Sequence, residues 1–148
     1  MANESTAEVT WSGDLLDGRG VIESVGSGAF GPLEITWKAR AEAHDGQTSP
    51  EELIAAAHAT CFAMALAHGL AQAGTPAEHL SSAARVTFVP GTGITTVALD
   101  VEGTVPGIDD AAFRDAANQA KDECPVSQSV RGNVDVSVTA RLQQPVSG

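Results

Sequence analysis

The feature that most constrains the fold is a long apolar segment, residues 50–73, with helix signals at both ends. Ser49 can cap a helix, Pro50 suits the first helical position, and Glu52 stands three residues after Ser49 as a capping-box partner. Gly74 follows the segment and favours termination of the helix. The pattern therefore predicts one long helix that ends at about residue 73.

Apolar side chains occupy several faces of this predicted helix. One stripe has spacings of three and four residues, and Ala, Leu and Phe also stand at other positions. We therefore expect the helix to be buried nearly all round and to form the central element of the fold. The stripe contains Ile54, Ala57, Cys61, Met64 and His68.

Short segments of β-forming residues lie on both sides of the helix, between turns that contain glycine. Before it we expect strands at 8–11, 20–23 and 33–37, a hairpin turn at Asp17-Gly18, and an exposed loop at 39–48. After it we expect a hairpin of 82–90 and 94–102, a helix from the cap Asp109 to Glu123, a turn at 126–131, and a strand at 134–142. This order is typical of an α+β fold rather than of regular βαβ winding.

Length and charge narrow the class of protein. The 148 residues favour one domain, 1–148, with loose ends at 1–5 and 143–148. Eight Lys and Arg against 19 Asp and Glu give a formal net charge of −11, which disfavours nucleic acid and anionic membranes as partners. The N-terminus has neither the basic segment nor the apolar segment of a secretion signal. No uninterrupted apolar stretch approaches the ~18 residues of a membrane span. We therefore expect a cytoplasmic protein. Two cysteines are too few for a disulfide scaffold but enough for one redox couple.

The sequence around the two cysteines carries the most specific signal. Residues 48–66, TSPEELIAAAHATCFAMAL, and residues 121–128, KDECPVSQ, closely resemble the two cysteine motifs of the family of osmotically inducible protein C (OsmC) and the organic hydroperoxide resistance proteins (Ohr). Trp-Ser-Gly-Asp at 11–14 and Val-Pro-Gly-Ile-Asp at 105–109 also fit the OsmC branch, so the resemblance covers nearly the whole chain.

The resemblance implies an OsmC-like fold, with antiparallel sheets wrapped around two central helices in an intertwined homodimer. It implies a thiol peroxidase that acts on organic hydroperoxides, and more weakly on hydrogen peroxide, without a metal or other cofactor, in defence against oxidative or osmotic stress. Cys61 would be the peroxidatic thiol and Cys124 the resolving thiol, with Arg40 and Glu51 as a supporting pair.

The chemistry is consistent with these residue types. A thiolate attacks peroxide, a guanidinium stabilises the thiolate, and a carboxylate can hold the guanidinium bidentately. Attack leaves a sulfenic acid on Cys61, which a second thiol condenses to a disulfide before overoxidation. An external dithiol must then reduce the disulfide; the resemblance suggests lipoyl-bearing proteins or small thiols.

The supporting arginine has two candidates. Arg40 fits the OsmC-like position, whereas Arg19 stands near the position that the Ohr branch uses; we favour Arg40. Glu51 and Cys61 are ten residues apart, which is about 15 Å along one helix. If both serve one small site, one must come from another subunit, so we predict a homodimer with shared sites.

Other interpretations of the thiols remain open. The protein could be a peroxide-sensing or ligand-binding module on the same fold, because fold alone does not prove activity. It could also be a thiol hydrolase in which His58 acts as a base toward Cys61, three residues away. The same pair could start a zinc site, but no second cluster of His and Cys supplies the missing ligands.

Overall fold

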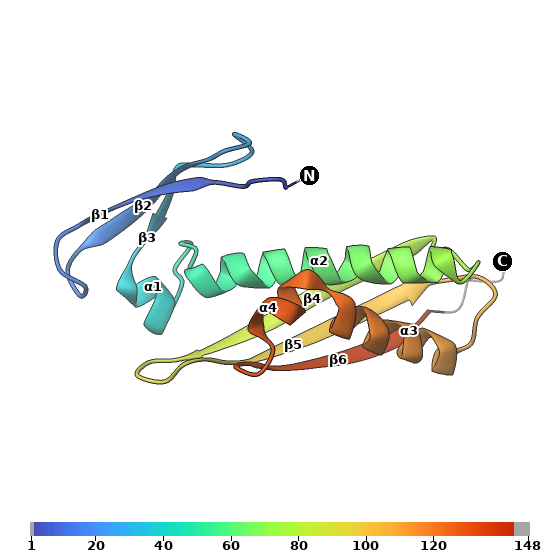
Figure 1. Cartoon of the computed structure of the whole chain (residues 1–148). Helices are drawn as coiled ribbons and strands as arrows, with labels where there is room; N and C mark the ends of the chain where they lie inside the picture. The colour runs from blue at the N-terminus through green and yellow to red at the C-terminus, as the bar shows by residue number, and fades with distance from the viewer. Residues whose placement is uncertain (1, 144–148) are drawn as a thin grey trace. The chain divides into compact units, whose positions relative to one another are not determined.

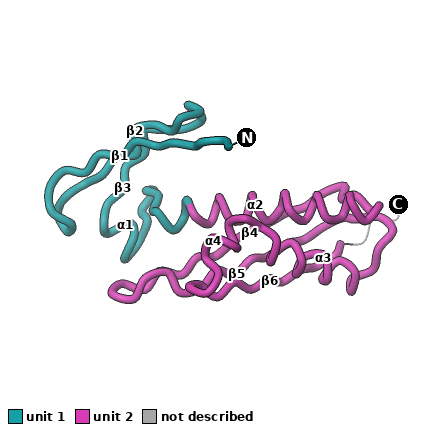
Figure 2. Tube along the Cα trace, in the orientation of Figure 1, with its two compact units in different colours: residues 1–53 teal, residues 54–148 magenta. Residues whose placement is uncertain are grey.

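The computed structural model describes residues 2–143 (Figure 1). The chain divides into two compact units, unit 1 (residues 1–53) and unit 2 (residues 54–148), which Figure 2 colours separately. Of the loose end expected at 1–5, the described residues 2–5 form no regular structure. The loose end expected at 143–148 lies, apart from residue 143, outside the described residues.

Unit 1 contains a three-stranded antiparallel sheet in the order β1-β2-β3, close to the strands expected. Its strands are β1 (Ala7–Ser12), β2 (Arg19–Val25) and β3 (Leu33–Ile35). The connection between β1 and β2 is longer than a tight turn at Asp17-Gly18. Asp14 closes it, because its carbonyl oxygen accepts from the Gly18 N–H at 3.0 Å and its carboxylate from the Asp17 N–H at 2.8 Å.

A short helix, α1 (Trp37–Ala41), follows β3 where the sequence predicted the end of a strand and then a loop. That prediction was wrong because Thr36 caps a helical turn: its hydroxyl oxygen accepts from the Ala39 N–H at 3.2 Å. This helix carries Arg40, one of the two candidate arginines.

The long helix is confirmed as α2 (Pro50–Gln72), and its ends have the expected chemistry. The Ser49 hydroxyl accepts from the Glu52 N–H at 3.1 Å, while the Glu52 carboxylate accepts from the Thr48 hydroxyl at 3.0 Å. Gly74 has a φ of 84°, the left-handed conformation that commonly ends a helix.

The buried face of α2 differs from the expected one. A stripe at every fourth residue, from His58 through Phe62 and Leu66 to Leu70, is buried within the single chain. Met64, which the predicted stripe contained, is 68% exposed. The helix is therefore not buried nearly all round in one chain; periodicity could not choose the face because small apolar residues surround the whole helix.

Unit 2 pairs its strands in the order β4-β5-β6. The predicted hairpin is confirmed as antiparallel β4 and β5. The resemblance implied antiparallel sheets, and for the last pair this is wrong: β6 runs parallel to β5, because the helical connection through α3 and α4 returns the chain to the same end of the sheet. The expected helix is confirmed with its cap, because the Asp109 carboxylate accepts from the Ala112 N–H at 2.8 Å. The elements are β4 (His79–Val89), β5 (Gly93–Thr104), α3 (Asp110–Glu123), α4 (Pro125–Val130) and β6 (Asp135–Leu142).

The core of unit 2 lies between its sheet and its helices (Figure 1). Phe62 of α2, Leu99 of β5 and Phe113 of α3 are each at most 2% exposed. Burial of such a side chain contributes about 1.5–3 kcal/mol to folding. Cys124 belongs to the same cluster, so one thiol is part of the core.

α2 is also long and apolar enough to cross a membrane, with a mean hydropathy of 1.6. Length and composition alone are weak evidence, since the core helix of a soluble protein meets the same criterion. In unit 2 this helix packs its stripe of Phe62, Leu66 and Leu70 into the core. One face of α2 therefore belongs to the core of unit 2, while only 22% of its most apolar window is buried within the single chain.

Candidate functional site

The two cysteines lie together in unit 2, and both are free thiols. Cys61 is half-buried on α2, and Cys124 is fully buried at the junction of α3 and α4. Their thiols are in hydrogen-bond contact. The structure therefore brings the two predicted redox residues together within one unit.

Local backbone chemistry fixes the position of Cys124. Its N–H donates to the Ala120 carbonyl at 2.9 Å, and this bond caps the C-terminus of α3. Its backbone is extended, which is the conformation that a following proline favours. Pro125 then occupies the first turn of α4, where its missing N–H costs nothing. The sequence predicted only a turn at 126–131, so the short helix α4 is a correction.

The surroundings of Cys61 within its unit favour the neutral thiol. Burial raises the pKa of Cys61, and the hydrogen bond with Cys124 raises it further, while the Val126 N–H, which donates to the sulfur, opposes both. The groups that shift this pKa belong to unit 2, as Cys61 does. A reactive thiolate at neutral pH would need additional stabilisation from a positive charge.

A buried hydrogen bond lies close to the thiols in the sequence. His58 Nε2 and Ser127 Oγ are 2.7 Å apart, joining α2 to α4. His58 is 0% exposed, and burial lowers its pKa, so the neutral imidazole is favoured. Ser127 was not predicted from the sequence. A signal was present in the spacing, because Ser127 follows Cys124 by three residues and His58 precedes Cys61 by three.

Arg40 and Glu51 form an ion pair in unit 1. Arg40 Nε donates to both carboxylate oxygens at 2.9 and 3.3 Å, and Nη2 lies 2.9 Å from Oε1. Glu51 is 6% exposed, in the first turn of α2, where a negative charge is favourable. The structure thus brings together the two residues predicted as a supporting pair.

Arg19, the other candidate, has different surroundings. It opens β2 with 69% of its side chain exposed, and its Nη1 lies 3.7 Å from Glu34. An exposed pair at this distance contributes little to stability and holds the guanidinium weakly. Of the two arginines, Arg40 has the tighter contact with its carboxylate.

An apolar pocket of about 530 Å³ lies in unit 1, next to Arg40. Trp11 and Trp37 both line it. Its remaining lining is Val9, Leu15, Gly20, Ile22, Ile35, Thr36, Pro50 and Leu53. The pocket combines an aromatic and aliphatic wall with one guanidinium, which is suitable for an apolar molecule with a polar end.

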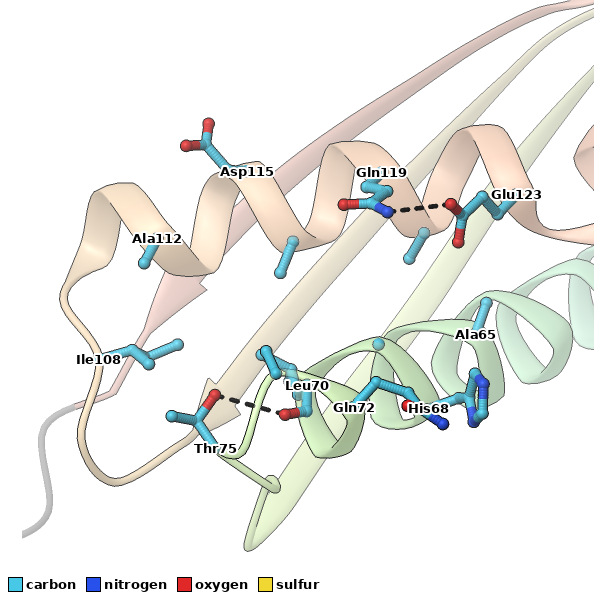
Figure 3. Close-up of a pocket in the computed structure, with 14 residues that line it drawn as sticks. Ala65, His68, Leu70, Gln72, Thr75, Ile108, Ala112, Asp115, Gln119 and Glu123 are labelled. Carbon is cyan, nitrogen blue, oxygen red and sulfur yellow. Dashed lines mark hydrogen bonds between the residues drawn. The ribbon is translucent and has the colours of Figure 1, made fainter.

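A pocket of about 550 Å³ lies in unit 2 between α2 and α3 (Figure 3). Its polar lining includes His68, Gln119 and Glu123, and the Gln119 amide donates to the Glu123 carboxylate at 2.9 Å. Neither thiol is among the described residues that line it. This pocket is therefore separate from the redox pair.

A resident metal has no ligand set in the part of the chain that the structure describes. Within residues 2–143 no group of three or more His, Cys, Asp and Glu side chains could hold an ion. His58, which the sequence paired with Cys61 as a possible start of a zinc site, bonds Ser127 through its Nε2.

Comparison with known proteins identifies the family. The sequence model of OsmC-like proteins matches residues 43–139, which include both cysteines, Glu51 and His58. A protein named peroxiredoxin OsmC, from Escherichia coli strain K12, is 37% identical over 90% of this chain and 94% of its own length. The chain belongs to the OsmC-like protein family.

Proteins of the Ohr branch are also similar. The organic hydroperoxide resistance protein of Xanthomonas axonopodis pv. citri is 36% identical over 62% of this chain and 66% of its own length. A solved structure, described as an organic hydroperoxide resistance protein OsmC from Legionella pneumophila, has a TM-score of 0.70 and 26% identity, covering 92% of this chain and 96% of that one. The α+β fold predicted from the sequence is thus confirmed.

Proposed function

We propose that the protein is a cysteine-based peroxidase that reduces organic hydroperoxides to alcohols through Cys61 and Cys124. Relatives named peroxiredoxin and organic hydroperoxide resistance protein support the detoxification of peroxides as its function. The observation that carries the mechanism is the contact between two free thiols, one half-buried and one fully buried. A half-buried thiol can meet substrate, while a buried neighbour is protected from direct oxidation.

The proposed cycle has two steps on the protein. The Cys61 thiolate attacks the terminal peroxide oxygen, the O–O bond breaks, and the alkoxide leaves as alcohol after taking a proton. Cys61 is then a sulfenic acid. Cys124 attacks its sulfur, the S–O bond breaks, and water leaves as the disulfide forms. The two thiols have thus supplied the two electrons that reduce one peroxide.

Thiolate formation requires a change in the surroundings of Cys61, because its pKa is raised within its own unit. We propose that the guanidinium of Arg40, held by Glu51, supplies the positive charge. Glu51 and Cys61 stand ten residues apart on α2, about 15 Å along its axis. The proposal therefore includes a homodimer in which the arginine pair of one subunit serves the Cys61 of the other.

The apolar pocket beside Arg40 supports an organic substrate. Its tryptophans and aliphatic side chains would bind the alkyl or aryl part of a hydroperoxide, and Arg40 would lie at the peroxide end. Hydrogen peroxide has no apolar part to fill this volume. We therefore propose that organic hydroperoxides are better substrates than hydrogen peroxide.

The cycle needs an external reductant for the disulfide. We propose a thiol reductant, either the dithiol of a lipoyl-bearing protein or two molecules of a small thiol, and no bound cofactor. If the protein lies in the cytoplasm, as we propose, such reductants are present around it. Dihydrolipoamide and glutathione can be compared as electron donors in a turnover assay.

The thiol hydrolase alternative receives less support. A catalytic base needs a ring nitrogen that bonds the nucleophile. His58 Nε2 bonds Ser127 instead, and His58 Nδ1 is buried with no hydrogen-bond partner among the described residues. The alternative of a peroxide sensor on the same fold predicts oxidation by peroxide without recycling by any dithiol.

The experiment is turnover with cumene hydroperoxide and dihydrolipoamide in wild type and two variants. Cys61→Ser should abolish turnover, and Cys124→Ser should allow one attack and then let Cys61 overoxidise. A Cys61→Ser variant with wild-type turnover would refute the proposal. Thioester hydrolysis that needs Cys61 but not Cys124 would favour the hydrolase instead.

A further inference from the structure

Two pairs of residues with the same spacing meet where α2 contacts the start of α4. His58 precedes Cys61 by three residues, and Ser127 follows Cys124 by three. Residues three apart lie on one face of a helix, about one turn from each other. The His58–Ser127 hydrogen bond and the contact between the thiols therefore join the same two parts of the chain about one turn apart.

The His58–Ser127 hydrogen bond is one of the contacts that hold α4, together with Val126, which packs against the core of unit 2. It is buried, since His58 is 0% and Ser127 6% exposed. α4 has only six residues and no side-chain cap at its N-terminus. A helix of this length is not stable by itself, so its contacts with the rest of the unit decide where its first turn lies.

The start of α4 carries two groups that hydrogen-bond with the Cys61 sulfur, one at its N-cap and one in its first turn. Cys124 supplies the second thiol and Val126 supplies an N–H donor, and both stand within three residues of Ser127. If the hydrogen bond of Ser127 were lost, the first turn of α4 could shift and would move both groups. Loss of either partner would also leave a buried polar group unpaired, which adds to the tendency of the turn to shift.

We propose that His58 and Ser127 are positioning residues for the resolving step, an inference that rests on the proposed function. Their hydrogen bond holds Cys124 where its sulfur can attack the Cys61 sulfenic acid. In that step the S–O bond breaks, the S–S bond forms and water leaves. If the turn shifts, a second hydroperoxide oxidises the sulfenic acid to sulfinic acid and leaves as alcohol.

The test measures how the sulfenic acid divides between these two products. Reduced protein is mixed with increasing concentrations of cumene hydroperoxide, and intact mass spectrometry gives the ratio of disulfide to Cys61 sulfinic acid. In Ser127→Ala we expect this ratio to fall by about fivefold to tenfold at equal peroxide concentration. A ratio does not depend on how fast the first attack occurs, and a general loss of stability would not change it within the folded protein.

Three further variants make the assignment specific. His58→Phe should lower the ratio as Ser127→Ala does, and the double variant should lower it no further, because both remove the same bond. His58→Gln keeps a group that can bond Ser127 and should restore part of the ratio. Ser82→Ala is the matched control: it also removes a buried hydroxyl, one with no hydrogen-bond partner among the described residues, and should leave the ratio unchanged.

The outcomes separate this inference from the proposed function. A wild-type protein that forms no Cys61–Cys124 disulfide would refute the proposed function itself. A wild type that forms it, together with a Ser127→Ala ratio equal to that of wild type, would overturn the positioning role alone. Additive effects of Ser127→Ala and His58→Phe would overturn it too.

Discussion

Replacement of Glu51 by Gln tests whether the arginine pair supports the reactive thiol. The Glu51 carboxylate accepts three close contacts from Arg40, at 2.9, 3.3 and 2.9 Å. Gln keeps the size of the side chain and one carbonyl oxygen but removes the negative charge. The guanidinium would lose its bidentate contact with a charged partner.

The expected effect follows from the geometry. Hydrogen bonds to charged groups contribute about 1.5–3 kcal/mol, which corresponds to a rate change of about 10- to 150-fold. Because 34% of the Arg40 side chain is exposed, solvent screens part of the interaction. We therefore expect the lower end, a decrease of about tenfold in the second-order rate constant with cumene hydroperoxide.

The assay is stopped-flow measurement of this rate constant in the reduced protein. Glu52→Gln is the matched control, since it makes the same chemical change on the adjacent residue, whose 56% exposed side chain accepts from the Thr48 hydroxyl. The control should react within about twofold of wild type, as expected for surface changes. A Glu51→Gln variant as fast as Glu52→Gln would refute the role given to the ion pair.

Three other predictions concern the arginines, the core and pH. Arg40→Gln should lower the rate constant with cumene hydroperoxide by about tenfold or more, and Arg19→Gln should leave it within about twofold; the reverse order would assign the role to Arg19. Phe62→Ala should lower the free energy of unfolding in urea by about 3–5 kcal/mol, because its side chain is 0% exposed; a loss below about 1 kcal/mol would contradict its place in the core. Burial lowers the pKa of His58 below its ordinary 6.5, so the unfolded chain binds a proton more readily than the folded chain does. The stability that the neutral imidazole contributes is therefore complete above about pH 6.5 and is lost as the pH falls below that value. Between about pH 7.5 and about pH 5.5 wild type should therefore lose more stability in urea than His58→Gln, and equal losses would contradict the assignment.

Local signals predicted the long elements of the fold well. Ser49, Pro50 and Glu52 marked the start of α2, and Asp109 marked the start of α3, because caps act within a few residues. The short helices were missed since each depends on one local device, the Thr36 hydroxyl for α1 and a proline in the first turn for α4.

Long-range features were not predictable in the same way. The buried face of α2 depends on which elements cover it, and the apolar residues around the helix did not distinguish Phe62 from Met64. The parallel pairing of β5 and β6 likewise depends on where α3 packs, not on the strand sequences. Cysteine motifs indicated Cys61 and Cys124, but the bond from Ser127 to His58 joins residues 69 apart, and no local pattern specifies such a pair.

The central claim is that Cys61 and Cys124 together reduce one hydroperoxide. Intact mass spectrometry of the reduced protein after one equivalent of cumene hydroperoxide, without added thiol, tests it most directly. We expect each chain to lose the mass of two hydrogens. Peptide mapping should find a bond between Cys61 and Cys124 of the same chain, because the two thiols are in contact within unit 2. An unchanged mass, or a disulfide that joins two chains, would contradict it.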